Sequence, residues 1–297
     1  MSLYGASEMW TDPILGYSHG MPEEGKPAME IALYGLGEMG SEIARCLARG
    51  GARVHTYDPS ESVEVEEKNL IRWDSVRHAA ENASVHLVVA KHLSDVESLL
   101  FSADGIGPNA SQKSLIAVHT TLTPEVVRDL HTRMRDTHGH TLVDAALSRR
   151  GGVVREGSLS LFVGAGDEAF AVARPVFDRY ADNVVHAGDV GAGMTVKLCN
   201  NWLLYANRHS ALQAIRTGRQ LGVDPAVLTD ALASSTGSSW ALSHYSDLDE
   251  AIVTGRGAPA VIRDRTASEL GMAKQMAAQD GEVPTSLQET FALLDVM

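Results

Sequence analysis

Cysteine, positive charge and long apolar runs are all scarce in this chain. Their scarcity argues against a disulfide framework, polyanionic partners and a membrane-spanning helix. Its 297 residues include only two cysteines, Cys46 and Cys199, so no disulfide framework is indicated. A formal net charge of −13 disfavours nucleic acid and anionic membranes as partners, because their phosphates would repel it. No apolar run reaches the ~18 residues that a membrane-spanning helix needs. We therefore expect a soluble, cytoplasmic protein in a reducing compartment.

The first 28 residues follow neither a helical nor a strand period. Met1–Ala28 is rich in Gly, Pro, Ser and acidic residues, and it lacks the basic start and apolar centre of a signal peptide. We interpret residues 1–28 as an N-terminal tail. The alternative is an arm that docks a partner through Tyr4, Trp10 and Tyr17.

Short β-rich runs alternate with helical patterns from Glu30 to about Val190. Strands spaced by helices indicate right-handed βαβ units and a largely parallel sheet. The expected strands are residues 31–34, 53–57, 85–90, 115–119, 141–145, 160–163 and 184–186, and the expected helices between them include 40–49, 124–137 and 168–180. This part of the chain is predicted to be an α/β domain.

The pattern changes after Gly191, where strand signals stop. From Gly193 to Leu221 there is no proline, and apolar residues recur at helical spacing. A helix of ~28 residues would be about 42 Å long, enough to support a second domain. Further helices are expected at residues 224–233, 259–279 and 284–296. We predict an all-helical domain over residues 191–297.

A glycine-rich turn joins the first expected strand to the first expected helix. Gly35, Gly37 and Gly40 form G-x-G-x-x-G, which gives a tight turn, room for a pyrophosphate and close packing of the helix on the sheet. The helix N-terminus that follows attracts phosphate. The pattern predicts a Rossmann dinucleotide-binding domain over residues 29–190; a SAM-dependent methyltransferase is the alternative.

One acidic residue bears on the choice of cofactor. Asp58 ends the second expected strand, 18 residues after Gly40, which is close to the ~20 expected for the acid that binds the adenosine ribose. A carboxylate at this place accepts hydrogen bonds from the ribose hydroxyls and repels a 2′-phosphate. The sequence therefore favours NAD over NADP.

Polar side chains interrupt the long helix near its start. Lys197 and Asn201 are four residues apart and share one face, and Asn200 adjoins them. Burying an amine beside a carboxamide on an apolar helix costs free energy. The group is therefore either a reaction centre, or a lysine directed to solvent with asparagines that cap neighbouring loops.

Together these motifs resemble the β-hydroxyacid dehydrogenase family, which includes 3-hydroxyisobutyrate dehydrogenase and is related to 6-phosphogluconate dehydrogenase. The resemblance extends from Met29 to the C-terminus. The family's G-L-G-x-M-G, Ser-Thr-x-x-Pro, D-A-P-V-S-G-G and G-x-G-x-x-x-K-x-x-N-N motifs are matched by residues 35–40, 120–124, 144–150 and 191–201.

The resemblance implies hydride transfer between NAD(P) and a small β-hydroxyacid or semialdehyde. Lys197 would be the acid/base, Asn201 would orient it and the substrate, and Ser148 would hydrogen-bond the substrate. The cofactor would contact Gly35, Leu36, Gly37, Glu38, Met39, Gly40, Asp58, His92, Leu93 and Thr120. The substrate would contact Ser148, Arg149, Arg150, Asn200 and Trp240.

The resemblance further implies that the helical domain binds the substrate and forms a homodimer or homotetramer. No metal is expected, because the histidines lack ligand spacing such as H-E-x-x-H.

The chain departs from the family pattern at four positions. Arg149 and Arg150 replace Gly-Gly, Ser268 replaces the lysine of K-D-L-x-L-A, and Ala146 replaces a proline. The arginines either bind a second anionic group of the substrate, in place of that lysine, or pair with surface acids.

Trp240 also has two interpretations. It lies in a segment, Ser234–Tyr245, that resembles a family loop closing over the site. It would line the substrate pocket or belong to the core of the helical domain.

Two other functions remain open at this point. Imine reductases share the architecture but often carry Asp or Tyr where Lys197 stands, and non-catalytic dinucleotide-binding homologues tend to lose the lysine. The intact Lys197 favours a dehydrogenase.

Overall fold

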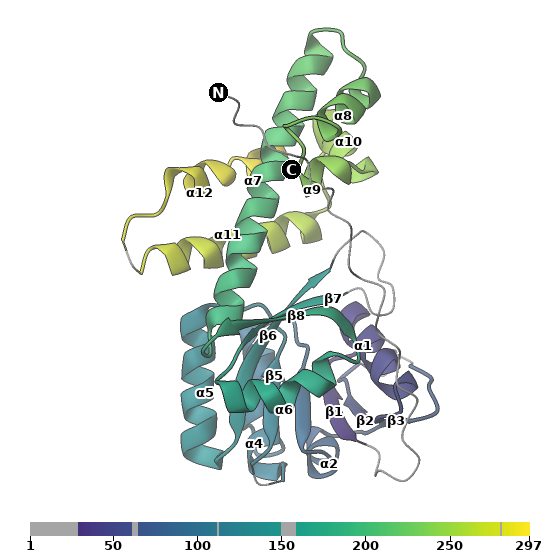
Figure 1. Ribbon diagram of the computed structural model, residues 1–297, viewed down its shortest axis with the longest axis vertical. Helices are drawn as coiled ribbons and strands as arrows, with labels where there is room; N and C mark the ends of the chain where they lie inside the picture. The colour runs from purple at the N-terminus through teal and green to yellow at the C-terminus, as the bar shows by residue number, and fades with distance from the viewer. Residues whose placement is uncertain (1–28, 61–64, 112, 150–158, 280) are drawn as a thin grey trace, which may run out of the picture.

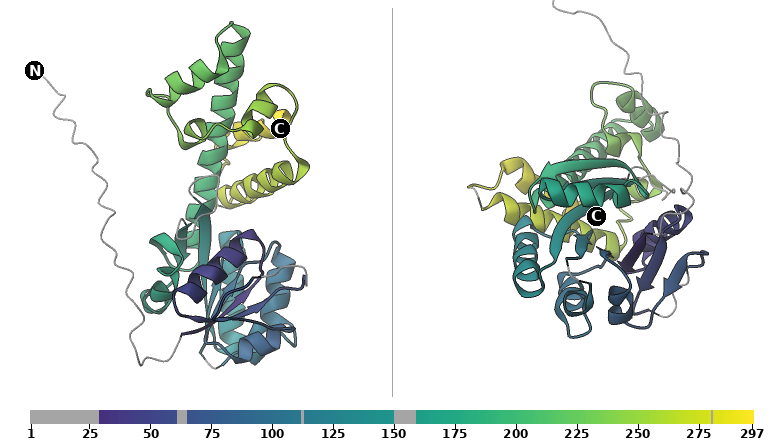
Figure 2. Two further views of the ribbon diagram at one scale, coloured as in Figure 1. Left: turned by 90° about the vertical axis from the view of Figure 1, so that its right-hand side faces the viewer. Right: turned by 60° about the horizontal axis from the view of Figure 1, so that its bottom comes forward.

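The computed structural model describes residues 29–60, 65–111, 113–149, 159–279 and 281–297. The expected tail at residues 1–28 and the candidate Arg150 lie outside these ranges. An α/β layer structure forms one end of the molecule, and a long helix leads from it into a group of helices (Figures 1 and 2).

Eight strands form one sheet in the order β3-β2-β1-β4-β5-β6-β7-β8. They are β1 Glu30–Tyr34, β2 Arg53–Tyr57, β3 Leu70–Arg72, β4 Val85–Val88, β5 Leu115–Val118, β6 Thr141–Arg149, β7 Leu159–Gly164 and β8 Ala181–Gly188. All neighbours are parallel except β6 and β7, which are antiparallel. The order reverses direction between β1 and β4, which is where doubly wound folds bind ligands.

Helices cover both faces of the sheet, so β1 is buried on both sides. Ile31 and Leu33 pack into one hydrophobic cluster together with α1 and α6, while Ala32 and Tyr34 face a second cluster formed with α2–α5. The helices of this part are α1 Glu38–Arg49, α2 Val76–Glu81, α3 Leu93–Phe101, α4 Ile106–Asn109, α5 Pro124–His138 and α6 Asp167–Phe177.

The ends of α5 illustrate why the sequence folds this way locally. The Thr123 hydroxyl accepts a hydrogen bond from the Val126 N–H, and Pro124 occupies the first turn, where it sacrifices no hydrogen bond. Gly139 ends the helix at φ 71°, a conformation that glycine adopts without strain. Each boundary thus has a local chemical cause.

The remaining helices form the second part around α7, which runs from Ala192 to Gln220 over 29 residues. The others are α8 Pro225–Ala233, α9 Trp240–Ser243, α10 Asp247–Val253, α11 Ala260–Ala277, α12 Thr285–Thr290 and α13 Leu293–Val296. Leu198, Tyr205, Leu212 and Ile215 of α7 are buried in their shared core. No helix in the described ranges is both long and apolar enough to cross a membrane.

The predicted α/β-then-helical architecture is confirmed, with differences in detail. The strand β3 and the helices α2, α3, α4, α9 and α10 were not among the expected elements. β6 extends to Arg149, four residues beyond the expected strand, so Ser148 and Arg149 lie in a strand rather than in a loop. The helix expected over residues 284–296 is two short helices, α12 and α13.

Candidate active site

The glycine-rich turn between β1 and α1 has the shape that a pyrophosphate requires. Gly35 has φ +96°, and a side chain there would collide with the Val89 carbonyl oxygen. A side chain at Gly40 would collide with the Gly35 carbonyl oxygen. At Gly37 nothing lies within 4 Å of an added Cβ, and no side chain caps α1. The first N–H groups of α1 therefore face open space and could bind phosphate.

Asp58 connects the end of β2 to this turn. Its Oδ2 accepts the Leu36 N–H at 2.6 Å, and its Oδ1 accepts the Ser60 N–H at 2.8 Å. Arg72 of β3 is too far along the sequence to be assigned to the cofactor from spacing, but its Nη2 donates to the carbonyl oxygens of Ser60 at 2.6 Å and Asp58 at 3.3 Å. Asp58, the acid expected to bind the ribose, thus has the Arg72 guanidinium beside its backbone.

Three more candidate cofactor residues lie at the carboxyl ends of β4 and β5. The Thr120 hydroxyl donates to the Ala90 carbonyl at 2.9 Å and accepts the Ala90 N–H at 3.0 Å, which joins the two strand ends. His92 is exposed, with its N–H donating to Asp95 at 3.2 Å, and Leu93 begins α3. Because parallel strands end at one edge of a sheet, these residues share the edge that carries the glycine turn.

A buried carboxylate fixes the start of α7 against β6. Asp144 accepts the N–H groups of Gly191 and Met194, both at 2.7 Å. A Cβ at Gly193 would lie 2.8 Å from the same carboxylate, so only glycine fits there. Burial raises the pKa of Asp144 to about 6, although the backbone N–H groups oppose that rise. The sequence motif includes Asp144, but sequence reasoning gave it no role.

Lys197 and Asn201 lie on one face of α7, shortly after the start of the helix that Asp144 holds. Lys197 is half-buried, and Asn201 is 4% exposed and accepts a hydrogen bond from the Asn200 amide at 3.3 Å. Burial lowers the pKa of Lys197; Glu269 of α11 raises it and Arg265 of α11 lowers it further.

Ser148 shares a face of β6 with Asp144, because residues four apart in a strand point the same way. Asp144 thus joins β6 to the start of α7, and each of these two elements carries a candidate site residue.

Sequence reasoning also missed a contact between α7 and α11. The Tyr205 hydroxyl donates to the Glu269 carboxylate. Tyr205 follows Lys197 by eight residues and Asn201 by four, so all three lie along one side of α7. Glu269 stands beside Ser268 in the matched motif, but nothing in the sequence pairs it with Tyr205.

Arg149 forms an ion pair with Glu38, the first residue of α1, at 2.8 Å. The Arg149 side chain is mostly buried, and Glu38 is exposed. The hydrogen bond from Arg149 is the main cause that lowers the pKa of Glu38. The charge of Arg149 is therefore matched by an acid of the glycine-rich turn.

Trp240 is 42% exposed, so the prediction of a core tryptophan is wrong. Its ring stacks on His244 at a centroid distance of 4.2 Å. The other hydrophobic residues of α9, Ala241 and Leu242, are buried instead, and they hold this short helix against its neighbours.

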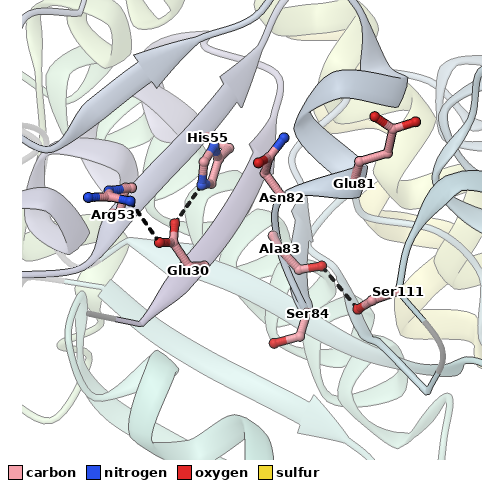
Figure 3. A pocket seen from close by; sticks show the side chains of 8 residues that line it. All are labelled: Glu30, Arg53, His55, Glu81, Asn82, Ala83, Ser84 and Ser111. Carbon is pink, nitrogen blue, oxygen red and sulfur yellow. Dashed lines mark hydrogen bonds and ion pairs between the residues drawn. The ribbon is translucent and has the colours of Figure 1, made fainter. Parts of the chain in front are cut away.

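A cavity of about 390 Å³ lies at the opposite edge of the sheet, near the amino ends of β1 and β2 (Figure 3). Glu30 pairs there with Arg53 at 3.1 Å and with His55 at 2.6 Å. Glu30 is therefore bonded to both of these neighbours. The cavity is separate from the candidate active site. Among the described residues, no group of three His, Cys, Asp or Glu could hold a metal ion.

Comparison with known proteins decides the family. A sequence model of the NAD binding domain of 6-phosphogluconate dehydrogenase matches residues 30–188, more than half of the chain. The chain belongs to the β-hydroxyacid dehydrogenase family. A second model, the NAD-binding region of NADP-dependent 3-hydroxyisobutyrate dehydrogenase, matches residues 191–293 of this family member.

A curated relative of this β-hydroxyacid dehydrogenase supports the same assignment. The 3-hydroxyisobutyrate dehydrogenase of Pseudomonas aeruginosa is 37% identical over 218 residues, which are 73% of each chain. The predicted family is thus confirmed, and the chain is an NAD(P)-dependent dehydrogenase that acts on CH–OH groups.

Solved structures show the same fold. A 3-hydroxyisobutyrate dehydrogenase from Mycobacterium tuberculosis, solved with L-serine, has a TM-score of 0.75 at 23% identity and covers 91% of this chain and 93% of its own. An imine reductase variant from Myxococcus stipitatus, in complex with NAD⁺, has a TM-score of 0.63 at 18% identity, covering 89% of this chain and 100% of its own.

Proposed function

We propose that this enzyme transfers hydride between NAD and a small β-hydroxyacid of the 3-hydroxyisobutyrate and serine type, with Lys197 as its acid/base. The observation that carries the proposal is the placement of Lys197 and Asn201 on α7, which Asp144 fixes against β6. In this proposal residues 29–190 bind the cofactor and residues 191–297 bind the substrate. Cytoplasmic location stays a prediction.

The proposed chemistry separates hydride and proton. When bound, the nicotinamide accepts the hydride from the hydroxyl-bearing carbon or returns it to the carbonyl carbon. In oxidation the neutral Lys197 amine takes the hydroxyl proton as the C=O bond forms; in reduction its ammonium gives that proton to the carbonyl oxygen. Burial lowers the pKa of Lys197, which raises the fraction of neutral amine near pH 7 above that of a solvated lysine.

Asn201 and Ser148 are assigned positioning contacts in this scheme. The buried Asn201 carboxamide lies one turn after Lys197 and can hydrogen-bond the substrate while it fixes the lysine. The Ser148 hydroxyl can bond the substrate carboxylate. The fold-level likeness to an imine reductase does not favour imines, because Lys197 supplies the proton transfer that an alcohol needs.

The preference for NAD rests on Asp58. Its carboxylate adjoins the glycine turn and can accept the ribose hydroxyls. Arg72 weakens this preference, since an arginine near the ribose acid could accept a 2′-phosphate. Rates with both cofactors are therefore part of the test.

We propose a homo-oligomer because the helical part exposes large apolar side chains. Three apolar side chains are exposed there: Leu203 of α7, Leu221 directly after α7, and Val227 of α8. A second copy of the chain that packs on this surface would remove them from water.

The test is oxidation of a panel of β-hydroxyacids, including 3-hydroxyisobutyrate and L-serine, with NAD and NADP. We expect turnover, and Lys197→Ala should lower kcat by about 10²- to 10⁴-fold, the usual contribution of acid–base catalysis. Binding of NADH, followed by fluorescence, should be unchanged. Loss of NADH binding in the variant, or full activity without the lysine, would contradict the proposal.

A further inference from the structure

The side of α11 that faces the active site carries a cation, Arg265, three residues before Ser268, the position where the family pattern has its lysine. Arg265 and Glu269 are four residues apart and share one face of α11. Glu269 accepts the Tyr205 hydroxyl, so this face is turned toward the side of α7 that bears Lys197 and Asn201. Figure 1 shows α11 beside the first half of α7, between the sheet and the other helices.

Two electrostatic effects of Arg265 agree with this placement of α11. Its positive charge lowers the pKa of Lys197 on α7. It also lowers the pKa of Glu38, which begins α1 directly after the glycine-rich turn. Because Coulomb interactions weaken with distance and solvent, a charge that acts on both Lys197 and Glu38 agrees with a place near both helices.

The charge of Arg265 has no counterpart in the part of the chain that the structure describes. Its side chain forms no ion pair or hydrogen bond there, whereas Arg149, the cation expected to bind the substrate, is paired with Glu38 at 2.8 Å. The motif lysine one turn later on α11 is Ser268. Lys197, Arg265 and Glu269 therefore form a group of two cations and one acid, and its net positive charge when the lysine is protonated favours a carboxylate.

We propose that Arg265 binds the carboxylate of the hydroxyacid substrate and so sets the preference of this enzyme for acids. The planar guanidinium can donate two parallel hydrogen bonds to a carboxylate, which fixes the substrate's orientation while Lys197 acts at the hydroxyl. The inference rests on the proposed function, since it assigns a substrate contact within the same site. It places the lost lysine's charge one turn earlier on the same helix.

The experiment compares an acid with its uncharged amide. Initial rates are measured for 3-hydroxyisobutyrate, or L-serine if that is the better substrate, and for the corresponding amide. The pH is set where the Lys197 amine is neutral in both enzymes, because removing Arg265 also raises the pKa of that lysine. Arg265→Gln should raise KM for the acid by about 10- to 100-fold, the range for a charge-assisted hydrogen bond, and leave kcat/KM for the amide within about twofold. Arg265→Lys should recover part of the loss.

Arg263→Gln is the matched control, because Arg263 is an exposed arginine of the same helix. It should leave acid and amide kinetics unchanged. Melting temperature and NADH affinity report whether each variant is folded. The proposal would be overturned if the ratio of kcat/KM for the acid to kcat/KM for the amide were the same in Arg265→Gln as in the wild-type enzyme. A wild-type enzyme that oxidises no hydroxyacid would instead refute the proposed function, and this inference with it.

Discussion

At the residue scale, the pH dependence of the reaction depends on the balance of charges around Lys197. Burial and Arg265 lower its pKa, and Glu269 raises it. Oxidation needs the neutral amine, so kcat for oxidation should rise with pH, with a midpoint below 10.5, the ordinary value for lysine. Reduction needs the ammonium, so its kcat should fall over the same pH range.

Glu269→Gln tests the assignment, because glutamine keeps an acceptor for the Tyr205 hydroxyl and removes the negative charge. Without that charge the ammonium is less stable, the pKa of Lys197 falls further, and both limbs should move to lower pH. The measurement is kcat against pH in both directions. An unshifted profile in this variant, or limbs that move to higher pH, would show that another group titrates.

Residues with local signals could be predicted from the sequence, and residues whose role depends on distant contacts could not. Gly35, Gly37 and Asp58 belong to one strand–turn–helix motif with known spacing. Arg72 and Arg265 act on the site only because β3 pairs with β2, and α11 packs on α7. No periodicity in the sequence carries that information.

At the element scale, strands with a local sequence signal were predicted, and strands that depend on distant contacts were not. Ile31–Tyr34 and Leu115–Val118 are continuous apolar runs, as expected for strands buried on both faces. β3 has only three residues, Leu70–Arg72, too few to show a pattern. β6 extends to Arg149 because β7 pairs antiparallel with it there, a tertiary cause that overrides local polarity.

The anchor of α7 gives a prediction at this scale. Asp144→Ala leaves the N–H groups of Gly191 and Met194 buried without their acceptor, which should cost about 2–6 kcal/mol of unfolding free energy at ~1–3 kcal/mol each. Because α7 carries Lys197, kcat should fall as well. Urea unfolding followed by fluorescence measures the first effect.

Asp189→Ala is the comparison, since Asp189 is an exposed acid in the same turn between β8 and α7. It should change the unfolding free energy by less than about 0.5 kcal/mol, as surface substitutions usually do. If the two variants unfold at the same urea concentration, the buried carboxylate does not fix the helix.

At the scale of the whole molecule, an acidic chain exposes apolar side chains on its helical part. Leu203 is 59% exposed in the middle of α7, and Val172 is 60% exposed on α6 of the sheet layer. If the helical part forms the interface between copies, a charge at Leu203 must be buried on association, whereas one at Val172 stays in water. Leu203→Glu should therefore give monomers, and Val172→Glu should leave the oligomer intact.

Light scattering after size-exclusion chromatography measures the mass of each variant against the 31.8 kDa chain. The melting temperature distinguishes dissociation from unfolding, because a variant that merely unfolds loses its cooperative transition. A wild-type monomer would refute the oligomer outright. Dissociation by Val172→Glu alone would move the interface to the sheet layer, where α6 covers β7 and β8. Dissociation by Leu203→Glu alone would assign the helical part both the catalytic lysine and the contact between copies, so activity should then depend on protein concentration.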